Sequence, residues 1–173
     1  MRGILSLKVY HCENFIEDLN ELGLTISEKQ KEQFIMYYEL LTEWNSFMNL
    51  TAITEFDEVM KKHFLDSLSF VHYIKKYCLA QEESQSNITG LEEQKFTMID
   101  VGTGAGFPGL ALKIAYPNLK ITLLDSLNKR INFLNEVIIQ LGLSGIEAIH
   151  DRAEDFAKPG KLREKFDLCV SRA

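Results

Sequence analysis

The chain has 173 residues, a formal net charge of −6 and 46% hydrophobic side chains, which is typical of one globular domain with room for a helical appendage. It has no apolar run near the ~20 residues that cross a bilayer, no secretion signal and no metal-binding cysteine spacing, so we expect a cytoplasmic protein without metal. Residues 1–95 hold 16 acidic and 9 basic side chains, and residues 96–173 hold 9 and 10. That balance excludes a generic polyanion binder, but it allows a nucleic-acid substrate held by a local patch.

The first part of the chain, residues 1–79, is expected to be a helical region. A short helix is followed by Ser27, which has a glutamine three residues on and therefore the capping-box pattern of a helix start. Apolar side chains then recur at helical spacing until Asn49. The next helix is expected to start near Thr54, with Asp57 as its capping partner.

Residues 80–95 are polar and acidic, and we interpret them as a mobile linker. Residues 96–173 then alternate between strand and helix patterns, which predicts a parallel sheet covered on both faces. The expected class is α/β, a Rossmann-like doubly wound sheet with an N-terminal helical extension. Strands are predicted at 96–101, 120–125, 146–149 and 166–170, and helices at 108–116, 128–141 and from 151 to 156.

A glycine-rich turn follows the first predicted strand, with Asp100 directly before it and Gly102, Gly104 and Gly106 within it. A turn between a strand and a helix is where such folds bind phosphates or cofactors, and glycine lets the backbone approach a ligand closely. Glycine turns also simply connect a strand to a helix, so the turn alone does not decide the function.

Two acidic residues make the interpretation more specific. Asp125 ends the next strand, 23 positions after Gly102, where a carboxylate can bind a ribose diol, although it can also be a solvated acid at a strand end. Asp100 would repel a pyrophosphate, whereas it suits a ligand with a cationic amino group and a sulfonium. We therefore expect S-adenosylmethionine as the cofactor, with both acids and the three glycines in its site.

The ends of the third and fourth strands supply further candidates. Ala153 and Glu154 are expected to meet the adenine, although acidic residues here also suit an ordinary helix N-terminus. Arg172 follows the fourth strand and is expected near the reacting atoms, because substrates bind beyond the carboxyl ends of parallel strands. Cys169 lies within the strand and is expected to be a core thiol rather than a nucleophile. No Asn-Pro-Pro-aromatic sequence is present, which disfavours methylation of an exocyclic amine.

Taken together, these motifs resemble the RsmG (GidB) family, the bacterial 16S rRNA guanine-N7 methyltransferases, over roughly residues 27–173. The glycine turn alone would indicate only a class I methyltransferase, and the order and spacing of all the segments are more specific. The matching segments are Trp44–Ile53, His63–Leu68, Asp100–Gly109, Asp125–Leu134, Ala153-Glu154 and Ser171–Ala173.

The resemblance implies a SAM-binding Rossmann-like domain over residues 96–173 and N7 methylation of a guanine in 16S rRNA of the small ribosomal subunit. We expect a monomer. The resemblance also implies cofactor contacts at Gly102, Phe107, Ala153, Glu154 and Arg172. Six residues would face the rRNA: Asn49, Thr51, His63, Asp66, Ser67 and Lys129. His63 can also lie on an ordinary helix surface, Asn49 and Thr51 can belong to a helix-ending turn, and Lys129 can be solvated.

One departure from the family pattern concerns the sheet. The family's domain continues for three more strands, whereas this sequence stops at Ala173, so we expect a domain truncated after strand four with a bare edge. On that reading the isolated chain is weakly active or inactive. The alternatives are a class I methyltransferase acting on a protein or small molecule, a non-catalytic SAM-binding module, and a dinucleotide-dependent oxidoreductase, which Asp100 argues against.

Overall fold

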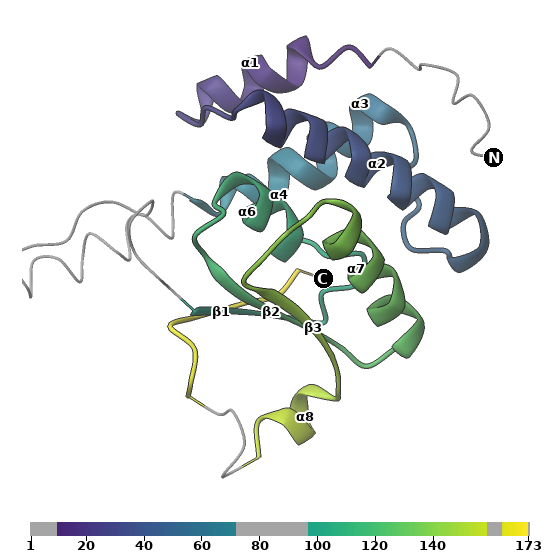
Figure 1. Cartoon of the computed structure of the whole chain (residues 1–173), viewed down its shortest axis with the longest axis vertical. Coiled ribbons are helices and arrows are strands. Elements are labelled where there is room, and N and C mark those ends of the chain that lie inside the picture. Colours follow the sequence, from purple (N-terminus) through teal and green to yellow (C-terminus); the bar gives the residue numbers. More distant parts are fainter. Residues whose placement is uncertain (1–9, 72–96, 159–163, 173) are drawn as a thin grey trace, which may run out of the picture.

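The computed structural model describes residues 10–71, 97–158 and 164–172. The predicted linker at residues 80–95 and the end of the predicted helical region lie outside these ranges. In Figure 1 the N-terminal helices lie above a twisted sheet. None of the described helices is long and apolar enough to cross a membrane.

The N-terminal region begins with helix α1 (Glu13–Glu21) and continues with the long helix α2 (Glu28–Met48). The predicted capping box is confirmed, because the Ser27 hydroxyl accepts from the Gln30 backbone N–H while the Gln30 side chain accepts from the Ser27 N–H. Helix α2 ends as expected at Asn49, which adopts a left-handed conformation with φ 52°. This end turns the chain back toward the sheet.

The next helix differs from the prediction. It begins at Phe56 rather than near Thr54, and no side chain caps its start, so the proposed Thr54–Asp57 capping pair is wrong. The Thr54 carbonyl instead accepts a hydrogen bond from a tyrosine hydroxyl of α2. The helix has three parts, α3 (Phe56–Val59), a π-helical turn (Met60–Leu65) and α4 (Asp66–Ser69).

The sheet contains four parallel strands in the order β3-β2-β1-β4. The chain passes outward from β1 to β3 and then returns to the other side of β1, so the order reverses between β1 and β4. Ligands of doubly wound sheets bind at such a reversal, beyond the carboxyl ends of the strands. The bounds are β1 (Thr97–Val101), α6 (Gly109–Ala115), β2 (Lys120–Asp125), α7 (Asn128–Gln140), β3 (Ile146–His150), α8 (Ala153–Phe156) and β4 (Leu168–Val170).

The doubly wound α/β prediction is confirmed, with the two faces of the sheet covered unequally. Helices α6 and α7 cover one face, and the N-terminal helices pack over them, so that both regions share one hydrophobic core. The short helix α8 lies on the other face, where Phe156 packs with Ile99 and Leu124 (Figure 1).

The fourth strand is shorter than predicted, because Phe166 lies outside it and packs on Phe156. Within the described chain β4 pairs only with β1, which leaves it at the edge of the sheet. The prediction that Cys169 is a core thiol is wrong, since its side chain is exposed. A side chain in a strand is buried only where other parts of the protein cover that part of the sheet. The alternation of residues along an edge strand does not show whether it is covered.

Candidate functional site

The glycine turn lies at the carboxyl end of β1 and is held against β2. The Gly102 N–H donates to the Leu124 carbonyl at 2.8 Å, and the Gly104 N–H donates to the Asp125 carboxylate at 3.0 Å. Gly102 has φ 68°, and a Cβ built on it would meet no atom within 4 Å. The turn therefore needs glycine at this position for its backbone conformation, and it leaves open space beside the backbone for a ligand.

Helix α2 supports the turn from the opposite side. The buried Tyr37 hydroxyl donates to the Ala105 carbonyl at 2.5 Å, and its ring stacks on Phe107 with centroids 5.4 Å apart. Burial raises the pKa of Tyr37 well above its ordinary value. A Cβ on Gly106 would lie 2.7 Å from the Tyr37 oxygen, so Gly106 packs against α2 rather than lining the open side of the turn.

Asp100, the last-but-one residue of β1, is fully buried yet only half satisfied. Its Oδ2 accepts from the Thr103 hydroxyl at 2.7 Å and from the Gly109 N–H at 2.9 Å. Its Oδ1 has no hydrogen-bond partner in the described chain. Burial raises the pKa of Asp100, while these two hydrogen bonds and the charge of Arg172 oppose the shift. A buried carboxylate oxygen without a partner suits a cationic ligand group.

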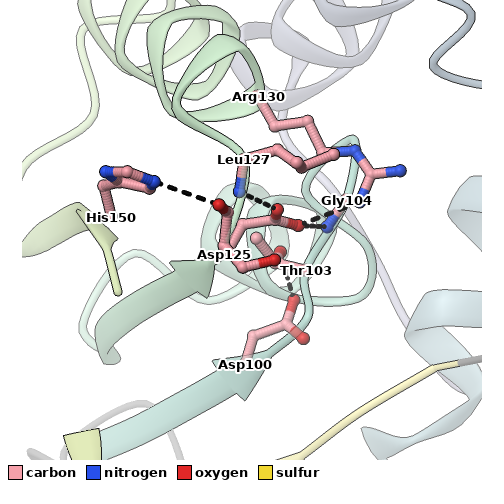
Figure 2. A network of polar contacts seen from close by, with 8 residues as sticks. Asp100, Thr103, Gly104, Asp125, Leu127, Arg130 and His150 are labelled. Carbon is pink, nitrogen blue, oxygen red and sulfur yellow. Dashed lines mark hydrogen bonds and ion pairs between the residues drawn. The ribbon is translucent and has the colours of Figure 1, made fainter. Parts of the chain in front are cut away.

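Asp125 ends β2 and organises the loop that follows. Figure 2 shows its carboxylate accepting from the N–H groups of Gly104 and Leu127 and from the Arg130 guanidinium, at 3.0, 2.9 and 3.2 Å. Beside it, His150 contacts the Ser126 carbonyl across the ends of β2 and β3. A carboxylate has about four acceptor positions, so one remains for a ribose hydroxyl, and a second opens only if Arg130 moves.

A pocket of about 340 Å³ lies at the carboxyl ends of β1, β2 and β3. Its lining includes Gly102, Asp125, Asp151, Ala153 and Glu154, so the structure brings together four of the predicted cofactor residues. A larger hollow of about 580 Å³ lies at the amino ends of the same strands, beside Thr97, Lys120 and Ile146, and contains none of the predicted residues. The smaller pocket is the better candidate, because parallel sheets bind ligands at their carboxyl ends.

A second group of predicted residues meets at the end of β4, centred on Arg172. Its guanidinium donates to Asp66 Oδ2 at 3.0 Å and approaches His63 Nδ1 at 3.2 Å, and it lies 4.9 Å from the centre of the Phe107 ring. Residues from the π-helical turn and the start of α4, from the glycine turn and from the segment after β4 are thus joined across more than 100 positions of sequence.

His63 is the centre of this group. Its ring stacks on Phe107 with centroids 4.7 Å apart and an interplanar angle of 19°. Its Nε2 lies 2.7 Å from the Thr51 hydroxyl. Burial and the positive charge of Arg172 lower the pKa of His63 below its ordinary 6.5, while Asp66 acts in the opposite direction. The imidazole is therefore held neutral at physiological pH.

Three predicted substrate residues lie outside this group. Ser67 is fully buried, and its hydroxyl donates to the His63 carbonyl one turn earlier. The left-handed conformation of Asn49 ends helix α2, and Lys129 is exposed on the first turn of α7. Tyr37, by contrast, is not among the residues that the sequence singles out, since helical spacing does not reveal which buried hydroxyl supports a loop.

The π-helical turn was also missed, although it carries His63 and ends directly before Asp66. The Asp66 N–H bonds to the Lys61 carbonyl five residues back. Such turns are rare and occur often at functional sites, and no residue spacing in the sequence announces this one. In the described residues no group of three or more His, Cys, Asp or Glu side chains is arranged to hold a metal ion.

The sequence matches the family described as rRNA small subunit methyltransferase G (GidB) over residues 30–173. The chain belongs to this family. It is 56% identical over 159 residues to a ribosomal RNA small subunit methyltransferase G of Lachnoclostridium phytofermentans, an alignment covering 92% of this chain and 59% of that protein. It is 48% identical over 161 residues to the protein of the same name from Leuconostoc mesenteroides, covering 93% and 62%. The chain thus spans about three-fifths of the length of these curated relatives.

A solved structure supports the fold assignment. A Plasmodium falciparum protein assigned as a protein-L-isoaspartate O-methyltransferase, in complex with S-adenosyl-L-homocysteine, superposes with a TM-score of 0.50. The match covers 95% of this chain and 74% of that one at 15% identity. At this identity the likeness concerns the fold alone.

Proposed function

We propose that the protein transfers a methyl group from S-adenosylmethionine to N7 of a guanine in 16S rRNA of the small ribosomal subunit. The observation that carries the proposal is the unpartnered Oδ1 of the buried Asp100, which lies at the reversal of strand order and suits a cationic amino group. Family membership and the names of the relatives support the ribosomal substrate. A ribosomal substrate also implies a cytoplasmic location.

In this proposal the pocket beside Ala153 and Glu154 holds the adenosine, Asp125 offers an acceptor to the ribose, and Asp100 holds the amino group. The open space at Gly102 allows the backbone to approach the ligand. When bound, the cofactor supplies an electrophilic methyl group on a sulfonium. Arg172, which is held by Asp66 and His63, orients the cofactor or the RNA at the other end of the site.

The chemistry asks little proton transfer of the protein. Guanine N7 has an in-plane lone pair, so the N–C bond forms as the S–C bond breaks, and no base must remove a proton. The neutral His63 suits this reaction, because the methylated guanine is cationic and a neutral imidazole adds no further positive charge to that of Arg172. The residues of the site then act by aligning the reactants and excluding water.

The proposal is tested by incubating the protein with S-adenosylmethionine labelled on its methyl group and with small ribosomal subunits that lack the modification. We expect label in 16S rRNA and strand cleavage at one guanine after borohydride and aniline treatment, which is specific for N7-methylated guanine. Equal labelling of bulk protein or of small molecules would favour a methyltransferase of another acceptor class. Binding of NADH in place of both S-adenosylmethionine and S-adenosylhomocysteine, measured by calorimetry, would refute the cofactor assignment.

A matched pair of variants separates the two halves of the site. Asp100→Asn is expected to reduce labelling at low concentrations of S-adenosylmethionine, because it weakens cofactor binding. Asp66→Asn, which loses a charge in an exposed ion pair with Arg172, is expected to reduce labelling while cofactor binding is retained.

A further inference from the structure

We propose that the Thr51 hydroxyl is a specificity-determining group that donates a hydrogen bond to O6 of the target guanine. The inference rests on the proposed function and adds to it a residue that distinguishes guanine from adenine. It follows from the hydrogen-bonding roles that Arg172 and His63 impose on this hydroxyl.

The tautomer of His63 is determined by Arg172. Arg172 has only N–H donors and stays protonated in proteins, so the His63 Nδ1 that lies 3.2 Å from it must be the acceptor. A neutral imidazole with an unprotonated Nδ1 carries its proton on Nε2. The contact of 2.7 Å between His63 Nε2 and Thr51 Oγ1 is therefore a donation from histidine to threonine.

Both acceptor positions of the Thr51 hydroxyl oxygen are used within the protein. Thr51 Oγ1 also accepts from the Ile53 N–H at 3.0 Å. A hydroxyl has two lone pairs and one proton, so both acceptor positions are filled. In the described chain the hydroxyl proton of Thr51 has no acceptor. The backbone is held in place as well, since the Thr51 N–H donates to Asn45 Oδ1 at 2.9 Å. Thr51 thus presents a fixed group that can only donate.

Guanine and adenine differ in the group that lies beside N7. Beside N7, guanine carries the acceptor O6, whereas adenine carries the amino donor N6. A group that can only donate fits guanine and leaves two donors facing each other with adenine. Discrimination of this kind is strong, because a site built to bond one partner is left with an unpaired polar group by the other.

The position of Thr51 agrees with this role. His63 stacks on Phe107, which follows the glycine turn directly and also lies beneath the Arg172 guanidinium. The Thr51 hydroxyl is hydrogen-bonded to Nε2 of the same imidazole, and Thr51 is partly exposed. In this proposal a base that brings N7 toward the cofactor side of this group places its neighbouring O6 beside Thr51.

The test measures binding of purine nucleotides to the chain saturated with S-adenosylhomocysteine, by calorimetry or NMR titration. The probes are guanosine and inosine 5′-monophosphates, which both carry O6, and the 2-aminopurine nucleotide, which lacks it. We expect Thr51→Val to weaken the first two by roughly fivefold, as for the loss of one neutral hydrogen bond, and to leave the third unchanged. Thr51→Ser, which keeps the hydroxyl, is expected to retain most of the preference.

Each other outcome overturns the inference. Equal weakening of all three nucleotides by Thr51→Val would mean that Thr51 acts only on the shape of the site, and no O6 preference in the wild type would mean that the hydroxyl does not read the base. NMR of ¹⁵N-labelled His63 checks the tautomer independently, since with a proton on Nδ1 rather than Nε2 at neutral pH the Thr51 hydroxyl would donate to the imidazole and not to a ligand. Failure of the proposed function appears separately, as absence of methyl transfer to guanine by the wild type.

Discussion

Replacing Asp100 by asparagine separates ligand binding from folding. The substitution keeps an oxygen to accept from Thr103 and Gly109, the two groups that bond the wild-type Oδ2. It removes the negative charge whose other oxygen has no partner in the described chain. A hydrogen bond to a charged group contributes about 1.5–3 kcal/mol, so S-adenosylmethionine is expected to bind roughly 10- to 150-fold more weakly.

Stability should move differently. Burial raises the pKa of Asp100, so the native state favours the protonated carboxyl, and the ionised form destabilises the fold above that pKa. The variant loses this penalty, and its free energy of unfolding in urea at neutral pH is expected to be no lower than that of the wild type. Lower affinity without lower stability distinguishes loss of a ligand contact from damage to the fold.

The sharpest assay is calorimetry with two ligands. S-adenosylmethionine carries the amino group, whereas 5′-methylthioadenosine keeps the adenosine and sulfur and lacks the amino-acid portion. Asp100→Asn is expected to weaken the first and to leave the second within about twofold, since the loss of one contact should not spread to a ligand that never made it. Equal losses for both ligands, or none for either, would refute the assignment of Asp100 to the amino group.

Three further outcomes follow from other parts of the structure. Tyr37→Phe leaves a buried carbonyl of the glycine turn unpaired and is expected to lower the free energy of unfolding by about 1–3 kcal/mol, whereas Tyr38→Phe, which loses an exposed hydrogen bond, should cost less in the same urea titration. The pKa of His63 is lowered on folding, so its contribution to stability is complete above pH 6.5 and is lost as the pH falls through its native pKa. His63→Asn should therefore flatten the acid limb of the curve of unfolding free energy against pH. An unchanged acid limb would contradict the burial of the ring. Cys169 is exposed and Cys12 is buried with a raised pKa, so Cys169→Ser should remove a fast-reacting thiol from the native protein in a thiol-exchange assay while Cys12→Ser should not.

Much of the α/β layer could be predicted because its signals are local. The capping box at Ser27, the ends of β2 at Asp125 and the start of α7 at Asn128 are each decided by a few neighbouring residues, and all agree with the structure. Among the predictions that failed are the start of the helix after Thr54 and the burial of Cys169. In the first case no side chain caps the helix and the Thr54 carbonyl accepts a tertiary hydrogen bond. In the second case the position of the strand in the sheet decides the exposure of the side chain.

The candidate site divides in the same way. Sequence by itself determined which residue types stand at the ends of the strands, because the glycine turn, its two acids and the Ala153-Glu154 pair follow local strand and turn patterns. Only the tertiary structure decided how they are used. Asp125 is largely occupied by its own loop, while Asp100 keeps one oxygen unpaired. Whether each carboxylate oxygen already has a hydrogen-bond partner depends on residues distant in sequence, and the spacing of residues along the chain does not show it.

The group around Arg172 is the clearest case of this limit. The sequence predicts Arg172 from its place after a strand and the other members only through a resemblance. Their contacts join segments more than 100 residues apart and depend on a π-helical turn that no local pattern predicts. The tautomer of His63 follows from the guanidinium beside it, and the direction of the Thr51 hydroxyl follows from the tautomer. Residue identity supplies the possible donors and acceptors, whereas the packing of distant elements selects which of them face a ligand.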